Sequence, residues 1–226
     1  MEQPICTIVG MASRVGLHVA KKFADEGFAV AMIGRTKFLL EKYQRKLARQ
    51  GYETHAFVAE GDSFSGLEKA FQNIHDTLGK TDVLVYNESV IAQGYASQMT
   101  GDEVLADLRI NVAGALVSAN AVIPHMKDQK RGTILFTGGE FAVEPDPNYA
   151  SLAIGNAGTR NLCIALAKEL EPDNIHVATV TIHGLAKVQT MFDPDGVKFE
   201  PEVIAEKFYE LYAQPVGQFE TEMVYC

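Results

Sequence analysis

The stretch from Ile5 to Ala20, ICTIVGMASRVGLHVA, contains the residues best suited to bind a phosphate group. A short apolar run ends at Gly10, a second glycine follows at Gly16, and an apolar helical pattern begins directly after it. A strand, a glycine turn and a helix in this order place free backbone N–H groups and the positive end of a helix dipole at one point. The pattern predicts an anion site at the turn, which also contains Ser13 and Arg14. A turn whose glycines serve only close packing is the plainer alternative.

Apolar runs alternate with amphipathic helical patterns along the rest of the chain. The expected strands are Ile5–Gly10, Ala29–Gly34, Thr54–Ala59, Asp82–Asn87, Thr133–Thr137, His176–Ile182 and Glu220–Tyr225, and the expected helices are Val15–Glu26, Lys37–Gln50, Phe64–Leu78, Asp102–Met126, Tyr149–Leu170 and Pro201–Ala213. Runs that are apolar throughout and separated by helices are typical of parallel strands buried on both faces. Right-handed crossovers then predict an α/β Rossmann fold, a doubly wound, seven-stranded parallel sheet in a single domain over residues 1–226.

The composition narrows the classes of partner. The chain has 226 residues and a formal net charge of −9, with no basic stripe, which argues against nucleic acid. Three cysteines, far apart and without a CxxC motif, predict reduced thiols and no metal site. We expect no signal peptide, because the first four residues carry no Lys or Arg, and no apolar run of membrane-spanning length. The expected location is therefore the cytoplasm.

Four landmarks occur in a specific order and spacing: the glycine turn, Asn87 at the end of the fourth strand, Asn111 in a long helix and Tyr149 at the start of the next helix. With these landmarks the chain resembles the short-chain dehydrogenase/reductase family over nearly its whole length. The resemblance implies hydride transfer between a nicotinamide cofactor and a carbonyl or alcohol. It also implies catalytic roles for Tyr149 and Asn111.

The end of the second strand indicates which dinucleotide is preferred. An acid there binds the ribose 2′-hydroxyl of NAD, whereas a cation accommodates the 2′-phosphate of NADP. The strand ends in Ile33-Gly34-Arg35, so Arg35 and the nearby Arg14 favour NADP over NAD. An exposed arginine that merely begins a helix is the alternative.

Other positions acquire cofactor roles from the resemblance alone. It implies that Gly10, Ser13, Arg14 and Gly16 form the phosphate turn, that Glu60 lies near the adenine and Asn87 near its ribose, and that Gly184 and Thr190 lie near the nicotinamide. Glu88 and Ser89 replace the Ala-Gly pair of the family, so bulk and negative charge stand beside the groove.

The catalytic set has a specific gap. A free phenol has a pKa of about 10, and the family places a lysine one helical turn after the tyrosine to favour the phenolate. Here Ala153 occupies that position, and Gly138 is the expected replacement for the substrate-holding serine. Side chains that could partly substitute are Thr137, Ser151, Asn156, His183 and Lys187. Without the lysine, alcohol oxidation should suffer more than carbonyl reduction, in which a neutral phenol can still donate a proton.

Three functional hypotheses remain. The first is an NADP-dependent reductase of a carbonyl substrate whose identity the sequence does not indicate, with a reduced or altered proton relay and a short lid over residues 184–200. The second is a catalytically impaired dinucleotide-binding sensor or partner protein of the same fold. The third is a methyltransferase-like protein with an adenosyl cofactor. It would need an acidic residue at the end of the second strand to hold the ribose, and Arg35 at that position argues against it. The resemblance and the small residues of the helix Tyr149–Leu170 predict a homodimer or homotetramer.

Overall fold

The computed structural model describes residues 3–12, 14–183 and 200–225. Its strands are β1 (Ile5–Val9), β2 (Ala29–Gly34), β3 (Thr54–Val58), β4 (Val83–Tyr86), β5 (Gly132–Gly139), β6 (Ile175–Ile182) and β7 (Glu222–Tyr225). Its α-helices are α1 (Val15–Asp25), α2 (Lys37–Ala48), α3 (Phe64–Thr77), α4 (Gly101–Leu108), α5 (Ala115–Gln129), α6 (Ala150–Leu170) and α7 (Pro201–Tyr212). Short helical turns are η1 (Ala96–Gln98), η3 (Glu140–Ala142), η4 (Glu171–Asp173) and the π-helical η2 (Arg109–Gly114).

The strands form one parallel, seven-stranded sheet in the order β3-β2-β1-β4-β5-β6-β7. Every residue of β1, β2, β4 and β6 is buried, as expected for parallel strands covered on both faces. The order in which strands are added to the sheet reverses between β1 and β4, and such a switch point opens a crevice at the carboxyl ends of the strands. This arrangement confirms the expected fold class, with strand ends shifted by one or two residues.

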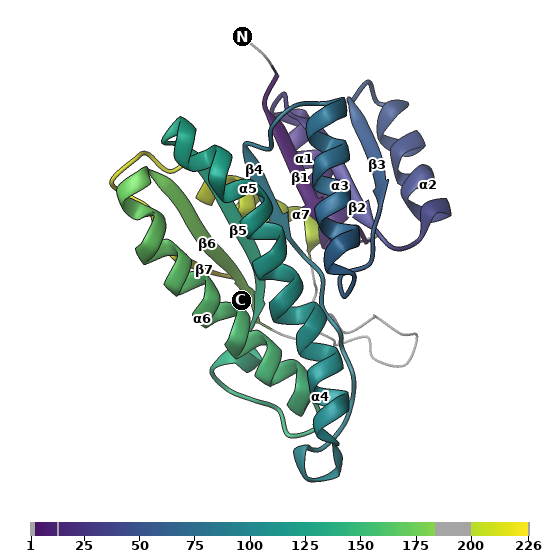
Figure 1. The fold of residues 1–226 in the computed structure, drawn as a ribbon, viewed down its shortest axis with the longest axis vertical. Helices are drawn as coiled ribbons and strands as arrows, with labels where there is room; N and C mark the ends of the chain where they lie inside the picture. Colours follow the sequence, from purple (N-terminus) through teal and green to yellow (C-terminus); the bar gives the residue numbers. More distant parts are fainter. Residues whose placement is uncertain (1–2, 13, 184–199, 226) are drawn as a thin grey trace.

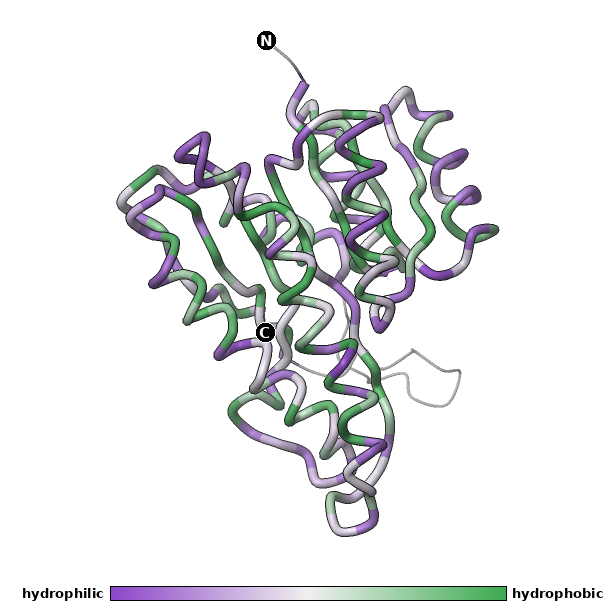
Figure 2. Tube along the Cα trace, viewed as in Figure 1, coloured by the Kyte–Doolittle hydropathy of each residue, from purple (hydrophilic) through white to green (hydrophobic). Residues whose placement is uncertain are grey.

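Two helical layers cover the sheet (Figure 1). Helices α1, α2 and α7 contribute to the apolar core on one face, and α3, α5 and α6 contribute to the core on the other. Hydropathy follows this arrangement, because the central strands are largely apolar while α2 and α3 alternate between apolar and polar residues (Figure 2). Helix burial is therefore driven by one apolar stripe on each surface helix.

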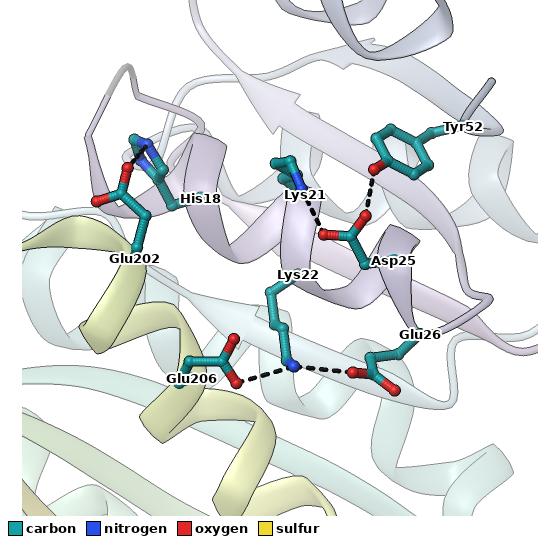
Figure 3. A network of polar contacts seen from close by, with 8 residues as sticks. All are labelled: His18, Lys21, Lys22, Asp25, Glu26, Tyr52, Glu202 and Glu206. Carbon is teal, nitrogen blue, oxygen red and sulfur yellow. Dashed lines mark hydrogen bonds and ion pairs between the residues drawn. The ribbon is translucent and has the colours of Figure 1, made fainter. Parts of the chain in front are cut away.

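A polar network fastens α7 to α1 (Figure 3). The Lys22 ammonium lies 2.8 Å from carboxylate oxygens of both Glu26 and Glu206, and His18 Nε2 lies 3.1 Å from Glu202. Below it, the rings of Phe23, Phe28, Tyr209 and Tyr212 pack edge to face or tilted. The aromatic contacts supply apolar burial and the ions fix the register of the two helices.

The longest helical run of the described residues, Gly101–Gln129, is also long and apolar enough, by length and composition alone, to pass as a membrane span. The sequence expectation is that no apolar run reaches membrane-spanning length. By length and composition that expectation is wrong for this helix. Packing buries 39% of its apolar window. The α5 part of the run buries Ala115, Ala119, Val122 and Met126 against the sheet and α3.

Candidate active site

The glycine turn after β1 is fixed by the residue that ends β4. Gly10 has φ +87°, and a Cβ on it would lie 2.5 Å from the Glu88 nitrogen and 2.6 Å from the Asn87 carbonyl carbon, so only glycine fits. Asn87 Nδ2 donates to the Gly10 carbonyl at 2.9 Å, and Thr137 Oγ1 donates to Asn87 Oδ1 at 2.8 Å. The Asn87 amide therefore joins the ends of β1, β4 and β5, and it acts on the turn by holding its backbone.

The first turn of α1 is suited to an anion. A Cβ on Gly16 would meet the Gly10 carbonyl oxygen at 3.2 Å, which shows how closely the helix approaches the strand. Among the described residues no side chain caps this helix, and its first turn contains no acidic residue. Leu17 donates its N–H to the Ala12 carbonyl at 3.0 Å, so the N–H groups ahead of it and the helix dipole are left to a ligand, which fits the phosphate site expected from the sequence.

A cavity of about 580 Å³ runs along the carboxyl edge of the sheet from this turn. Arg14 and Arg35 line it, together with Asn87 and Glu88. The size is in the range of ligand sites that hold a sizeable small molecule. The glycine cradle, the uncapped helix and the two guanidinium groups fit the diphosphate and the adenosine half of a nicotinamide dinucleotide.

Not every expected residue reaches the cavity. Gly16 packs beneath the turn, and the exposed Glu60 stands after β3 outside the lining. Tyr149 and Asn111 also lie outside the lining. The positions Ser13, Gly184, Thr190 and Lys187, and the proposed lid except Glu200, fall outside the described residues.

Tyr149 is half-buried beside the cavity. Its hydroxyl accepts a hydrogen bond from Gln93 Nε2 at 2.8 Å, and its ring stacks on Phe141, which does line the cavity, at 5.8 Å between centroids. A parallel bridge between Gly94 and Tyr149 ties the loop after β4 to the start of α6. The phenol therefore lies one ring away from the cavity, with its oxygen held by an amide.

Asn111 is buried within the π-helical turn η2. Its Oδ1 accepts a hydrogen bond from the Val90 N–H at 2.7 Å, and its Nδ2 has no partner among the described residues. That amide presses on α6, because a Cβ on Gly155 would lie 2.5 Å from it. The π turn frees backbone carbonyls that side chains then satisfy: Tyr86 donates to Ile110 and Thr159 donates to Asn111.

The two glycines at the end of β5 differ in the direction of their missing side chains. A Cβ on Gly138 would point at Thr179 Oγ1 of β6, at 2.6 Å, whereas a Cβ on Gly139 would point at Asn156 Nδ2 of α6, at 2.5 Å. Gly139 is therefore the glycine that faces α6, whereas Gly138, the position expected for the serine, faces β6. Asn156 Nδ2 occupies the space where the Cβ of a side chain at position 139 would lie.

The cavity-lining face of α6 contains Leu152 and Asn156, which are four residues apart and share one side of the helix. Tyr149 and Ala153 form a neighbouring row. Ala153 donates its N–H to the Tyr149 carbonyl at 2.9 Å and is buried, so one helical turn does separate the two, as the sequence indicates. No lysine occupies the turn after Tyr149.

Glu140 and His183 lie close together at the η3 end of the cavity. Glu140 lines the cavity, and its Oε2 lies 3.7 Å from Nδ1 of His183. His183 does not line the cavity itself and donates its backbone N–H to Tyr225 at 2.8 Å. Of the two side chains weighed from the sequence as substitute cations, His183 thus lies outside the cavity lining, beside Glu140.

Glu88 is the functional candidate that sequence reasoning treated only as an obstacle. It lines the cavity, and burial together with the Asp62 carboxylate raises its pKa, while Arg35 lowers it. Burial is the larger cause. Its position directly after Asn87 is the sequence feature that could have placed it in the cavity wall.

The cysteines match the expectation of reduced thiols. Cys6 and Cys163 are free and buried, and burial raises the pKa of both, that of Cys163 to about 12. Cys226 lies outside the described residues. Within the described ranges no group of three or more potential metal ligands occurs.

The comparisons with known sequences agree on one family. The family model for short chain dehydrogenase matches residues 4–191. The chain is 26% identical to 2,3-dihydro-2,3-dihydroxybenzoate dehydrogenase of Bacillus subtilis (strain 168) over 181 residues, covering 80% of this chain and 69% of that protein. It is 28% identical to 3-dehydrosphinganine reductase TSC10A of Arabidopsis thaliana over 221 residues, covering 96% of this chain and 64% of that protein.

Solved structures have the same fold. An actinorhodin polyketide ketoreductase variant with NADPH superposes with a TM-score of 0.92 at 20% identity, covering 100% of this chain and 98% of that one. A metagenomic short-chain oxidoreductase in complex with NADP gives 0.87 at 22% identity, covering 99% and 96%. With the sequence match over most of its length, the chain belongs to the short-chain dehydrogenase family of NAD(P)-dependent oxidoreductases.

Proposed function

We propose that the protein is an NADP-preferring reductase of a small carbonyl compound. One observation carries the proposal: a single cavity brings together the glycine turn, Arg14, Arg35 and the α6 residue Asn156. Arginine can bind a phosphate through two parallel hydrogen bonds, and two arginines beside the adenosine end favour the 2′-phosphate. NADP or NADPH in the solved relatives supports this choice.

The reaction end of the cavity favours reduction over oxidation. Reduced nicotinamide, when bound, supplies a hydride. The chain then has to hold the carbonyl oxygen and deliver a proton to it. Asn156 Nδ2, half-buried on the cavity wall, is the N–H donor placed to hold that oxygen. Tyr149 is the proton donor, and as a neutral phenol it needs no lysine in this direction.

Assembly and location are further parts of this proposal. Leu105 of α4, Leu116 of α5 and Ile154 of α6 are large apolar side chains exposed on the described structure. Helix α6 contacts both α4 and α5, so these residues support a homodimer or homotetramer built on this side. We propose a cytoplasmic protein that takes neither nucleic acid nor membrane as a partner, consistent with its acidic net charge of −9.

The test has two stages. Calorimetric titration with NADPH and, in parallel, with NADH should show tighter binding of NADPH. A panel of aldehydes and ketones should then reveal NADPH oxidation, and Tyr149→Phe should lower that rate by about 10² to 10⁴-fold. If neither NADPH nor NADH binds, the proposal is overturned.

A second function is favoured by the chemistry of α6. Ala153 leaves the turn after Tyr149 without a cation, and the Tyr149 hydroxyl is engaged by Gln93. A dinucleotide-binding sensor or partner protein without turnover fits these two facts. Binding of NADPH with no oxidation across the carbonyl panel would select this function.

A further inference from the structure

Glu88 is a half-buried carboxylate without a direct partner. It begins the loop after β4, and its Cγ and Cδ lie 3.5 and 3.7 Å from where a Cβ on Gly61 would stand. No hydrogen bond or ion pair joins it to another side chain in the part of the chain that the structure describes. An ionised carboxyl is costly to bury in this way. Its place in the wall of a ligand cavity suggests that a ligand, rather than the fold, accounts for it.

The charges that Glu88 experiences come from the neighbouring strand ends. Arg35, after β2, attracts it, and Asp62, after β3, repels it. Arg14 of the glycine turn and Glu140 of η3 are the other charged side chains of the same cavity wall. Arg35 is exposed, makes no hydrogen bond or ion pair within the described residues, and lines the cavity with Glu88. The cation expected to read a 2′-phosphate therefore shares its cavity with two carboxylates, of which Glu88 is the one that Arg35 attracts.

We propose that Glu88 is a specificity-determining residue that opposes the adenosine 2′-phosphate and so reduces the preference for NADP that Arg35 would otherwise give. The inference rests on the proposed function, since it concerns the same dinucleotide site. A 2′-phosphate drawn to Arg35 enters the field of the Glu88 carboxylate, and like charges brought together in a partly desolvated site repel strongly. A ribose 2′-hydroxyl carries no charge and meets no such repulsion.

Adenosine fragments test this without relying on the reaction end. Adenosine 2′,5′-bisphosphate and 5′-AMP differ only in the 2′-phosphate, and calorimetry gives the dissociation constant of each. At pH 8 and low salt, Glu88→Gln should tighten binding of the bisphosphate by about tenfold. Binding of 5′-AMP should change less than twofold. Glu88→Ala should act in the same direction, and Glu68→Gln, which removes an exposed carboxylate of α3, should leave both constants unchanged.

The two proposals fail in different ways. If Glu88→Gln changes both fragments equally, or neither, Glu88 does not determine specificity, while a wild-type preference for the bisphosphate would still support the NADP assignment. If Arg35→Ala leaves bisphosphate binding unchanged, the NADP assignment fails, whatever Glu88→Gln does. Thermal unfolding of each variant establishes that it is folded before titration.

Discussion

Asn156 Nδ2 on α6 lies 2.5 Å from the place where a Cβ on Gly139 of β5 would stand. The amide of Asn156 thus occupies the space that the first atoms of a side chain at position 139 would fill. Both line the cavity that contains the glycine turn. The Asn156 amide of α6 therefore places an N–H donor where Gly139 of β5 has no side chain.

Loss of the Asn156 amide should weaken carbonyl reduction. We expect Asn156→Ala to lower kcat by about tenfold, because a hydrogen bond to a substrate oxygen that strengthens in the transition state is removed. In the Asn156→Ala background, Gly139→Ser should restore part of the rate, since its Cβ no longer meets an amide. Steady-state NADPH oxidation measures both. Asn161→Ala, on the same helix with its side chain bonded to the Ala157 carbonyl, should retain wild-type kcat; an equal loss there would point to a general effect on α6.

The turn after β1 should accept no side chain at position 10. Gly10→Ala combines a positive φ with a Cβ placed 2.5 Å from backbone. We expect a loss of about 1–2 kcal/mol from the backbone and a further 1–3 kcal/mol or so from overpacking. Dinucleotide binding should be lost with it. Gly27→Ala provides the matched control, because Gly27 has φ +91° and no atom within 4 Å of the added Cβ. Urea unfolding and NADPH titration of both variants check this, and normal binding by Gly10→Ala would contradict it.

Glu88 should make the fold less stable as the pH rises. Its pKa is raised in the folded state, mainly by burial, so the folded protein holds the proton more tightly than the unfolded chain. Stability from this group is fully present below the ordinary glutamate pKa of about 4.3 and is lost as pH rises through the folded value. Glu88→Gln should therefore raise Tm at pH 8 and have little effect at pH 4. A Tm difference that is larger at pH 4 would refute this sign.

Lys22 should contribute to the docking of α7. Its side chain is half-buried, its ammonium lies between two carboxylates and 4.7 Å from the Tyr209 ring centroid, and hydrogen bonds to Glu206 and Glu26 raise its pKa. We expect Lys22→Met to reduce the free energy of unfolding by about 1 kcal/mol. Lys37→Met removes an exposed lysine 3.9 Å from Glu41 and should have almost no effect. Urea denaturation distinguishes the two.

The sheet could be predicted from the sequence because its strands are apolar on both faces and the intervening helices are amphipathic. The glycine turn and Arg35 could be placed for the same reason, since strand ends meet at one edge. The orientation of individual side chains could not be predicted from the sequence. Whether the family serine corresponds to Gly138 or Gly139 depends on the direction of one Cα–Cβ bond at a strand end. Asn111 carries no pattern that distinguishes a cavity-facing amide from a buried one.

The helix from Gly101 to Gln129 illustrates the same limit, because its period changes within the run. The π-helical turn η2 adds one residue to the repeat between α4 and α5. One residue corresponds to about 100° of rotation around a helix axis. The turn therefore lets α4 contact α6 with one side while α5 buries a different side against the sheet. Chain length within residues 109–114 is consequently constrained as well as residue type: a deletion of one residue there would close the wide turn to α-helical spacing and withdraw the Ile110 and Asn111 carbonyls that Tyr86 and Thr159 bind, whereas a surface loop would absorb the same deletion.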